Sequence, residues 1–463
     1  MRVAVIGGGL GGLVAAHGLV SAGFDAHVFE AGTPGGVIAT SEIDGFVREH
    51  AASSFLGGPA RGALALCEEL GVEVEPASPR AKRRWIYIDG KLRALPRSPI
   101  DLVRSDLLTW RGKLALLREP FAARKGTEDE SMHDFAARRF GVEAARAIVA
   151  PFVTGIFAAD AHDISLEAGF PRLAQLDADG GIVRGAAKQF ARNAFTRLAG
   201  KRTAKTSSGM WAPVGGLSAL VEALVAKLGP RVRADHRVRS LAPAGDSAPS
   251  RDYDGQAHSP APASGGVLVD GEHWDAAVLA TPAHDAAELV ATMPELATRL
   301  RVFTRAPVAV VYLGFPAAAV PRASDGFGFL SAQGEDLRVL GVVFESTVWS
   351  HRAPQDQVLL RCIFGGARDP DATKLSDAEL IETARRDIAK ALDATGTPTH
   401  TSIVRSPAGL AQYPVGHRDL VRGAVAAGRS HRIVLAGADY RGAGVNDLCA
   451  DRDVVVAELR TWT

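Results

Sequence analysis

The first residues that could do chemistry are three glycines, spaced as Gly7-x-Gly9-x-x-Gly12 after a short apolar run. A helical pattern follows, expected from Leu10 to Ala22. This spacing lets the backbone of a strand-to-helix turn approach a pyrophosphate, while the helix N-terminus offers free N–H groups to the anion. Glu30 ends a second apolar run about 20 residues on, where a carboxylate can hold ribose hydroxyls. The pattern predicts a dinucleotide site and leaves FAD and NAD both open.

A second glycine-rich turn lies near the C-terminus. An apolar run, 433–436, leads to Gly437 and then to Gly442-Ala443-Gly444, and a helix is expected to begin with Asn446 as its N-cap. A helix N-terminus beside small residues suits the end of a flavin ring that gains negative charge on reduction. An ordinary strand-turn-helix unit is the alternative. The nucleotide pattern at the start of the chain favours the functional interpretation.

A cluster of bases, Lys82, Arg83 and Arg84, stands at the mouth of a predicted strand, 85–88, which ends in an Asp89-Gly90 hairpin turn. It could be a solvated edge, a phosphate contact, a membrane contact or a site for an acidic substrate. The chain as a whole has a net charge of only +1, so nucleic acid is not expected as a partner. Arg84, last before the strand, is the preferred carboxylate ligand, because a guanidinium can hold a carboxylate in a bidentate fork.

Composition sets the remaining bounds. The chain has 463 residues, of which 47% are hydrophobic, and this suits two or three globular domains. Its three cysteines are widely spaced and form no CxxC pair, so we expect no metal site and a reducing, cytoplasmic compartment. No signal peptide, no membrane-spanning run and no Ser-His-Asp spacing is evident.

The elements that must position these residues are interleaved along the chain. Nucleotide-type segments occur at both ends and in the middle. Residues 97–205 are mostly helical by pattern, 305–365 are rich in strands, and 376–393 form an amphipathic helix. Residues 242–266 have almost no apolar content and are expected as a surface loop inside a hairpin. The predicted fold class is therefore α/β.

Several blocks together resemble one known family, the FAD-dependent protoporphyrinogen oxidases of the flavin amine oxidase superfamily. They are "FEAGTPGGVIAT", the stretch 130–173, "DGFGFLSAQGEDLRVLGVVFESTVWSHRAP", "AQYPVGH" and "LAGADYRGAGVND". The stretch around residues 81–99 looks closest to bacterial, myxobacterial-type members. The likeness runs nearly end to end.

The resemblance implies a domain plan and an activity. Residues 1–75, 206–300 and 411–463 would form a Rossmann-like FAD domain, 76–96 and 301–410 a mixed-sheet substrate domain, and 97–205 a helical, membrane-binding domain. The enzyme would oxidise protoporphyrinogen IX to protoporphyrin IX and reduce three O2 to H2O2. Two alternative functions stay open. One is oxidation of coproporphyrinogen III to coproporphyrin III, and the other is binding of flavin or porphyrin with little turnover. A homodimer and handover to ferrochelatase are further partners that the resemblance allows.

The resemblance also implies site residues. Substrate contacts would be Arg84 to a propionate, the Gly155 carbonyl toward the pyrrole N–H groups, and the apolar side chains Phe327, Leu330 and Ile363. FAD contacts would be Gly7, Gly8, Gly9, Leu10, Gly11, Gly12, Glu30, Ala31, Gly36, Val37, Ala51, Ala52, Ser53, Ser54, Val238, Ala438, Ala443, Gly444 and Val445.

Two departures lie in this FAD shell. The chain has Thr33-Pro34 where most members have a charged residue and Leu, and it has Ala51-Ala52 where most have Gly-Pro.

Surface charge bears on the membrane prediction. From Arg80 to Lys125 there are thirteen Lys and Arg against four Asp and Glu, and seven bases with no acid run from Arg184 to Lys205. A basic amphipathic surface can lie on anionic lipid, which predicts peripheral contact with the cytoplasmic face of a membrane. The commoner alternative is a solvated charged face over packed helices.

Four further polar residues are weaker candidates: His417 as a proton relay, and His50, Asp160 and Asp439 near the expected site, each of which could equally be structural.

Overall fold

Two large sheets organise the chain in the computed structural model, which describes residues 1–58, 62–122, 128–182, 184, 209–244 and 265–463. The predictions for 185–205 and for the loop within 245–264 therefore lie outside the described residues. The first sheet is entirely parallel and its strands come from both ends and the middle of the chain. In spatial order they are β10 (Val232–Arg233), β2 (Asp25–Phe29), β1 (Arg2–Ile6), β14 (Ala276–Leu279) and β20 (Ile433–Leu435).

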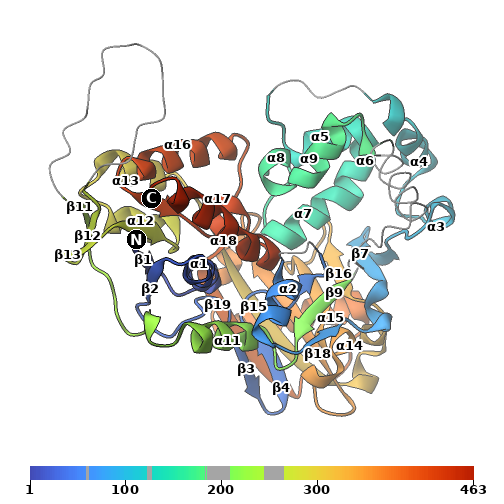
Figure 1. Cartoon of the computed structure of the whole chain (residues 1–463). Helices are drawn as coiled ribbons and strands as arrows, with labels where there is room; N and C mark the ends of the chain where they lie inside the picture. Colours follow the sequence, from blue (N-terminus) through green and yellow to red (C-terminus); the bar gives the residue numbers. More distant parts are fainter. Residues whose placement is uncertain (59–61, 123–127, 183, 185–208, 245–264) are drawn as a thin grey trace, which may run out of the picture.

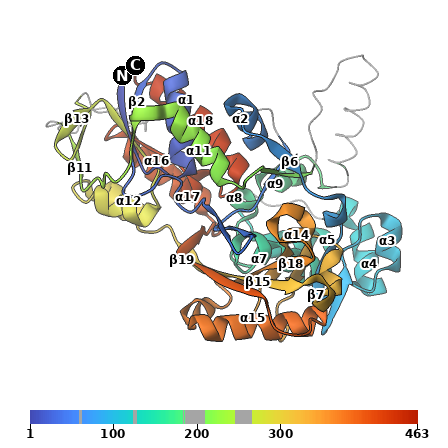
Figure 2. The ribbon, with the colours of Figure 1, turned by 90° about the horizontal axis from the view of Figure 1, so that it is seen from below.

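Helices cover both faces of this parallel sheet, which is why its strands read as continuous apolar runs (Figure 2). Alternate strand residues point to opposite sides, so Val3 and Val5 join one core while Ala4 and Ile6 join the other. The first core is closed by α1 (Leu10–Ser21), α2 (Ala63–Leu70), α11 (Ser218–Leu228) and α18 (Val445–Arg460), and the second by α12 (Ala283–Leu289), α13 (Pro294–Leu300) and α16 (His417–Arg429).

The second sheet is mixed, as predicted, with one parallel pair, β7 beside β16. Its order is β19 (His400–Ala411), β15 (Arg305–Pro316), β18 (Gln357–Gly365), β17 (Gly341–Phe344), β16 (Gly328–Ser331), β7 (Arg84–Ile88) and β8 (Lys91–Ala94). The hairpin turn at Asp89-Gly90 is confirmed, with φ values of 52° and 70°.

Each face of the mixed sheet has a different neighbour. Helix α15 (Asp377–Leu392) packs on one face through Leu380, Ala384 and Ile388, and it begins with a Ser376–Glu379 capping box (Figure 2). The amphipathic helix predicted at 376–393 is thus confirmed. Helix α7 (Ala150–Phe157) lies over the opposite face at β16.

Three small sheets and a helical group complete the fold (Figure 1). The small sheets are β3 (Thr40–Ile43) with β4 (Phe46–Glu49), β5 (Phe55–Leu56) with β9 (Met210–Pro213) and β6 (Val74–Pro76), and β11 (Leu241–Pro243) with β12 (Val267–Val269) and β13 (Glu272–Trp274). The helices are α3 (Pro99–Arg104), α4 (Trp110–Leu117), α5 (Met132–Phe140), α6 (Val142–Ala144), α8 (Leu166–Gly169) and α9 (Pro171–Ala178), with α17 (Ala438–Arg441) near the C-terminus. Among the described residues, none of the helices is both long and apolar enough to cross a bilayer.

One helix boundary was predicted wrongly. Helix α18 begins at Val445 with Gly444 as its N-cap, not with Asn446. The Asn446 side chain instead accepts a hydrogen bond from the backbone N–H of Ala63 at 2.8 Å and donates one to the carbonyl of Leu56 at 2.8 Å. A capping side chain must bond its own helix, and this one bonds a segment almost 400 residues earlier in the chain.

Candidate functional site

The N-terminal glycine loop has the geometry that the motif predicts. Gly7 has a φ of +106°, and its N–H donates to the carbonyl of Phe29 at 2.9 Å. A Cβ at Gly12 would lie 1.9 Å from the carbonyl oxygen of Gly7, so only glycine lets α1 approach β1 this closely. A Cβ at Gly9 would meet nothing within 4 Å, and the first turn of α1 carries no acidic side chain and no side-chain cap. The loop therefore leaves an open cradle with free amides, which fits a pyrophosphate.

Glu30 is held beside this cradle. Its two carboxylate oxygens accept hydrogen bonds from the N–H groups of Gly8, at 2.7 Å, and Gly32, at 2.9 Å. The backbone carbonyl of Glu30 also accepts a hydrogen bond from the N–H of His236 at 2.8 Å. This bond places the segment that leads to Val238 beside Glu30. The carboxylate stays at the mouth of the loop, where it can reach a ribose hydroxyl.

The second glycine pair folds back on the first loop. The N–H of Gly35 donates to the carbonyl of Gly8 at 2.8 Å, and a Cβ at Gly36 would lie 3.2 Å from the Cα of Gly9. Val37 next to them is 51% exposed, although it is apolar. The pair closes one side of the cradle and leaves an apolar side chain open to a ligand.

The C-terminal turn meets the cradle from the other side. A Cβ at Gly11 would lie 3.4 Å from the Cα of Gly437, so the start of α1 and the turn after β20 are in contact. Ala438 and Ala443 also pack against the cluster that contains Phe157 of α7. The predicted flavin turn therefore touches the nucleotide loop directly and is joined through Tyr413 to the helix that carries Gly155.

The predicted segment 51–54 is anchored by two arginines that the sequence analysis missed. The Arg361 guanidinium donates to the carbonyl of Ala51, and Arg352 donates to the carbonyl of Ser53 at 3.0 Å. These bonds fix the backbone where the chain has Ala51-Ala52, one of its departures from the resembled family.

Buried acids accompany these arginines. Arg352 is 2.7 Å from Glu345 and 3.2 Å from Glu49, and all three side chains are 1% exposed. Burial raises the pKa of Glu49, while the Arg352 charge opposes that shift. The signal in the sequence was a charged residue inside an apolar run, as in "VLLRCIF", but spacing alone does not reveal its partner.

One face of the mixed sheet gathers the predicted substrate residues. Strand pairing places Leu330 opposite Gly341, which pairs in turn with Ile363. A Cβ at Gly155 would lie 2.6 Å from Leu330, so α7 rests directly on this row. Arg84 pairs with Gly328 one row away, and its guanidinium stands 5.3 Å from the ring centre of Phe327.

The cation cluster beside the strand divides by partner. Arg83 pairs with Asp325, and its charge lies 5.4 Å from the ring centre of Trp85. Among the described residues, the contacts of the Arg84 guanidinium are the sulfur of Met210, at 3.8 Å, and the face of Phe327, with no carboxylate. Of Arg83 and Arg84, Arg84 is thus the one whose guanidinium is able to bind a carboxylate group of a ligand.

Three of the weaker candidates have hydrogen-bond partners within the protein. Asp439 accepts a bidentate pair from Arg305, with the shortest contact at 2.8 Å, and a bond from the N–H of Ala283 at 2.7 Å. Asp160 accepts from the N–H of His162 and the side chain of Gln333, both at 2.9 Å. His50 lies 2.9 Å from the hydroxyl of Ser41.

His417 packs against aromatic rings rather than lining the open site. Its ring centre is 4.6 Å from that of Tyr413 and 5.5 Å from that of Phe303, and burial lowers its pKa. The Tyr413 hydroxyl donates to the carbonyl of Ala438, so this block supports the C-terminal turn.

Comparisons with known proteins agree with this arrangement. Residues 10–447 match the family described as flavin containing amine oxidoreductase. The chain is 26% identical to a coproporphyrinogen III oxidase of Bacillus subtilis (strain 168), covering 100% of this chain and 98% of that protein. It is 29% identical to protoporphyrinogen oxidase 2, chloroplastic/mitochondrial, of Arabidopsis thaliana, over 86% and 81% of the two chains.

Solved structures share the fold. A crystal structure of a protein from Exiguobacterium sp. 255-15 matches with a TM-score of 0.79 and 23% identity, over 100% of this chain and 99% of that one. Putrescine oxidase bound to putrescine matches with a TM-score of 0.67 and 16% identity, over 99% of each chain.

Proposed function

We propose that this chain, which belongs to the flavin containing amine oxidoreductase family, oxidises a porphyrinogen to a porphyrin with O2 as the acceptor. The observation that carries the proposal is the meeting of two features. A cofactor turn at Ala438 and Ala443 is joined to α7 through the apolar cluster around Tyr413, and α7 rests on a sheet face where the Arg84 guanidinium has no carboxylate partner among the described residues and stands beside an apolar wall. The relatives named as protoporphyrinogen and coproporphyrinogen III oxidases support the same chemistry.

FAD is the cofactor of this flavoprotein, and the residues present fit it. The open cradle at Gly9 would hold the pyrophosphate, Glu30 the ribose, and the turn 437–445 the ring. Held by these residues, FAD would supply two-electron oxidation of the substrate, with O2 as the final electron acceptor.

The side chains of this chain bind and orient the substrate. Arg84 would hold a propionate, and Phe327, Leu330 and Ile363 would contact the macrocycle, with few polar anchors among apolar walls. Positive charge that develops in the substrate spreads over the pyrrole nitrogens, so no strong protein base is required and positioning is the main task. Gly155 lies in the last turn of α7, where carbonyls lack helical partners, and its oxygen would accept a pyrrole N–H.

Arg84 and Lys82 should differ sharply when replaced. Arg84→Ala should raise KM for the porphyrinogen by about tenfold or more, the value of one lost charge-assisted hydrogen bond, while FAD content stays normal. Lys82→Ala should change KM little, because Lys82 ends the short 3-10 turn 79–82 and lies outside β7, the strand that carries Arg84. Steady-state kinetics of both variants is the measurement, and equal effects would return this stretch to a charged strand edge.

The turnover assay itself tests the function and chooses the substrate. We propose protoporphyrinogen IX as the preferred substrate, with coproporphyrinogen III as the rival that carries four propionates. Purified yellow protein should form fluorescent porphyrin from one of the two, and kcat/KM for each decides between them. A protein that binds FAD but forms no porphyrin from either would instead support a binding protein with little turnover.

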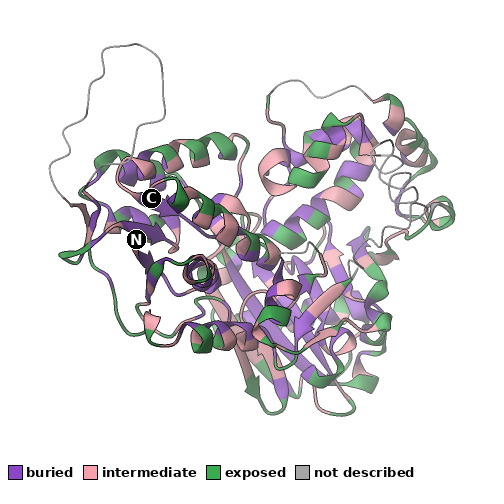
Figure 3. Ribbon diagram, viewed as in Figure 1, coloured by how far each residue is buried: buried purple, intermediate pink, exposed green. Residues whose placement is uncertain are grey.

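We also propose peripheral contact with an anionic membrane through α3, α4 and the turn that follows. Large apolar side chains are exposed there, among them Leu117 at 71% and Phe121 at 84%. Figure 3 shows that much of the ribbon in this region, at the right of the view, is exposed. Bases share the surface, since Lys113 stacks 4.7 Å from the ring centre of the exposed Trp110. Exposed apolar residues among Lys and Arg are typical of surfaces that lie in the lipid headgroup region.

Charge placed on this surface should abolish the contact. A Leu117→Asp, Phe121→Asp double variant should lose cosedimentation with anionic vesicles, because two apolar anchors are replaced by charges that anionic lipid repels. Val302→Asp, at an apolar residue 48% exposed elsewhere, is the matched control and should sediment like the parent protein. Parent protein that stays in the supernatant at low salt would contradict the proposal.

The homodimer, the cytoplasmic location and the handover to ferrochelatase stay predictions.

A further inference from the structure

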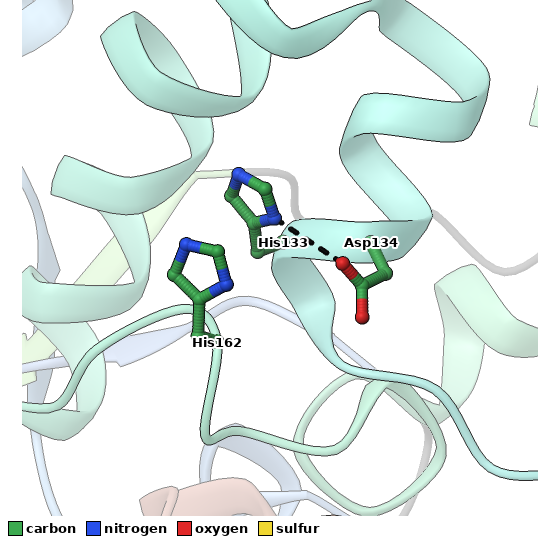
Figure 4. A group of neighbouring side chains, drawn as sticks. All are labelled: His133, Asp134 and His162. Atoms are coloured by element: carbon green, nitrogen blue, oxygen red, sulfur yellow. Dashed lines mark hydrogen bonds and ion pairs between the residues drawn. The ribbon is translucent and has the colours of Figure 1, made fainter.

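A cluster of three potential metal ligands lies at the start of α5 and in the loop that follows α7. It consists of His133, Asp134 and His162 (Figure 4). One ligand atom from each residue lies within 4.8 Å of the others. The imidazole nitrogen Nδ1 of His133 is 3.3 Å from Oδ1 of Asp134, and Figure 4 shows both rings directing a nitrogen toward that carboxylate.

One of these distances already matches the needs of a tetrahedral ion. Two ligands at about 2.0–2.1 Å from zinc lie about 3.3–3.4 Å apart, which is the separation already present between His133 and Asp134. The ring centres of His133 and His162 are 3.6 Å apart, so the two imidazoles already stand side by side.

The backbone holds the two ligand segments together. The N–H of His133 donates to the carbonyl of Ala161 at 2.9 Å, and the N–H of Met132 donates to that of Ile164 at 2.7 Å. Ser131 and Ser165 form an antiparallel bridge beside them. His162 and Asp134 are exposed, so their side chains can turn and the stacked rings can separate to take an ion without moving packed groups.

We propose that His133, Asp134 and His162 bind one divalent transition-metal ion, with Zn2+ as the preferred ion. Two imidazoles and one carboxylate suit zinc and its neighbours rather than Mg2+ or Ca2+, which prefer oxygen ligands. The ion would join the first turn of α5 to the loop that follows α7, and it would stabilise the segment directly after the helix that carries Gly155.

Calorimetric titration of the full-length holoenzyme, free of affinity tags and treated with a chelator, tests the proposal with Zn2+ alone as the probe. The parent protein should bind one Zn2+, which His162→Ala should weaken by at least about tenfold, and Mg2+ should give no binding. His284→Ala is the matched control, because His284 is also exposed and lies 3.4 Å from a neighbouring carboxylate, that of Asp285. Within the part of the chain that the structure describes, His284 belongs to no group of three potential metal ligands.

The thermal midpoint gives an independent readout. Zn2+ should raise the midpoint of the parent protein and of His284→Ala but not that of His162→Ala, because binding to the folded state alone stabilises it. Parent protein without a zinc site, or His162→Ala that binds zinc as tightly as the parent, would overturn the proposal. Since His162 is exposed, its replacement is not expected to disturb folding.

Discussion

Gly9→Ala should leave the apoprotein folded and lower its affinity for FAD by at least about tenfold, about 1.4 kcal/mol. Gly9 has φ −66° and ψ 172°, a conformation open to any residue, and a Cβ there would meet no protein atom within 4 Å. The methyl group would instead enter the space that we propose for the pyrophosphate. The measurements are flavin content after purification, FAD titration of the apoprotein, and its thermal unfolding.

Comparison of Gly12→Ala with Gly9→Ala separates a folding defect from a defect in FAD binding alone. Its Cβ would lie 1.9 Å from the Gly7 carbonyl, so α1 must shift away from β1. We expect destabilisation of the apoprotein at or above the about 1–3 kcal/mol typical of overpacking, together with loss of FAD. If Gly9→Ala bound FAD as tightly as the parent protein, the pyrophosphate would not lie at this loop.

Arg352→Met should lower the free energy of unfolding by about 3–5 kcal/mol, the cost of leaving buried charge without its partner. The change leaves Glu49 and Glu345, each 1% exposed, without the guanidinium between them. It also releases the carbonyl of Ser53, so FAD affinity should fall as well. Chemical denaturation of the apoprotein and FAD titration are the measurements.

Two controls make this result specific. Arg83→Ala removes an arginine whose side chain is 47% exposed and paired with Asp325, and surface pairs of this kind contribute about 1 kcal/mol or less. Arg352→Met combined with Glu49→Gln should recover part of the loss, because it removes the charge that loses its arginine, whereas Glu345 keeps Arg361 at 3.9 Å. A denaturation midpoint for Arg352→Met equal to that of Arg83→Ala would mean that the buried cluster is not needed for the fold.

The sequence by itself determined the local units. The strand-loop-helix at Gly7 to Gly12, the hairpin at Asp89-Gly90 and the helix 376–393 were predictable, because glycine spacing, turn chemistry and apolar periodicity act within a few turns of chain. The family resemblance then named Arg84, Leu330 and Gly155, but their proximity could be seen only in the sheet pairing and in the packing of α7.

Only the tertiary structure decided the partners of polar groups. Arg352 bonds Glu49 across 303 positions of sequence, Asn446 bonds Ala63 instead of capping its own helix, and the His162 ring stacks on that of His133. A buried charge must find an opposite charge or a hydrogen bond wherever the fold supplies one, and that requirement leaves no periodic trace in the sequence. Apolar periodicity therefore predicted the helices and strands. The hydrogen-bond and ion-pair partners of polar side chains, which lie on distant elements, were visible only in the tertiary structure.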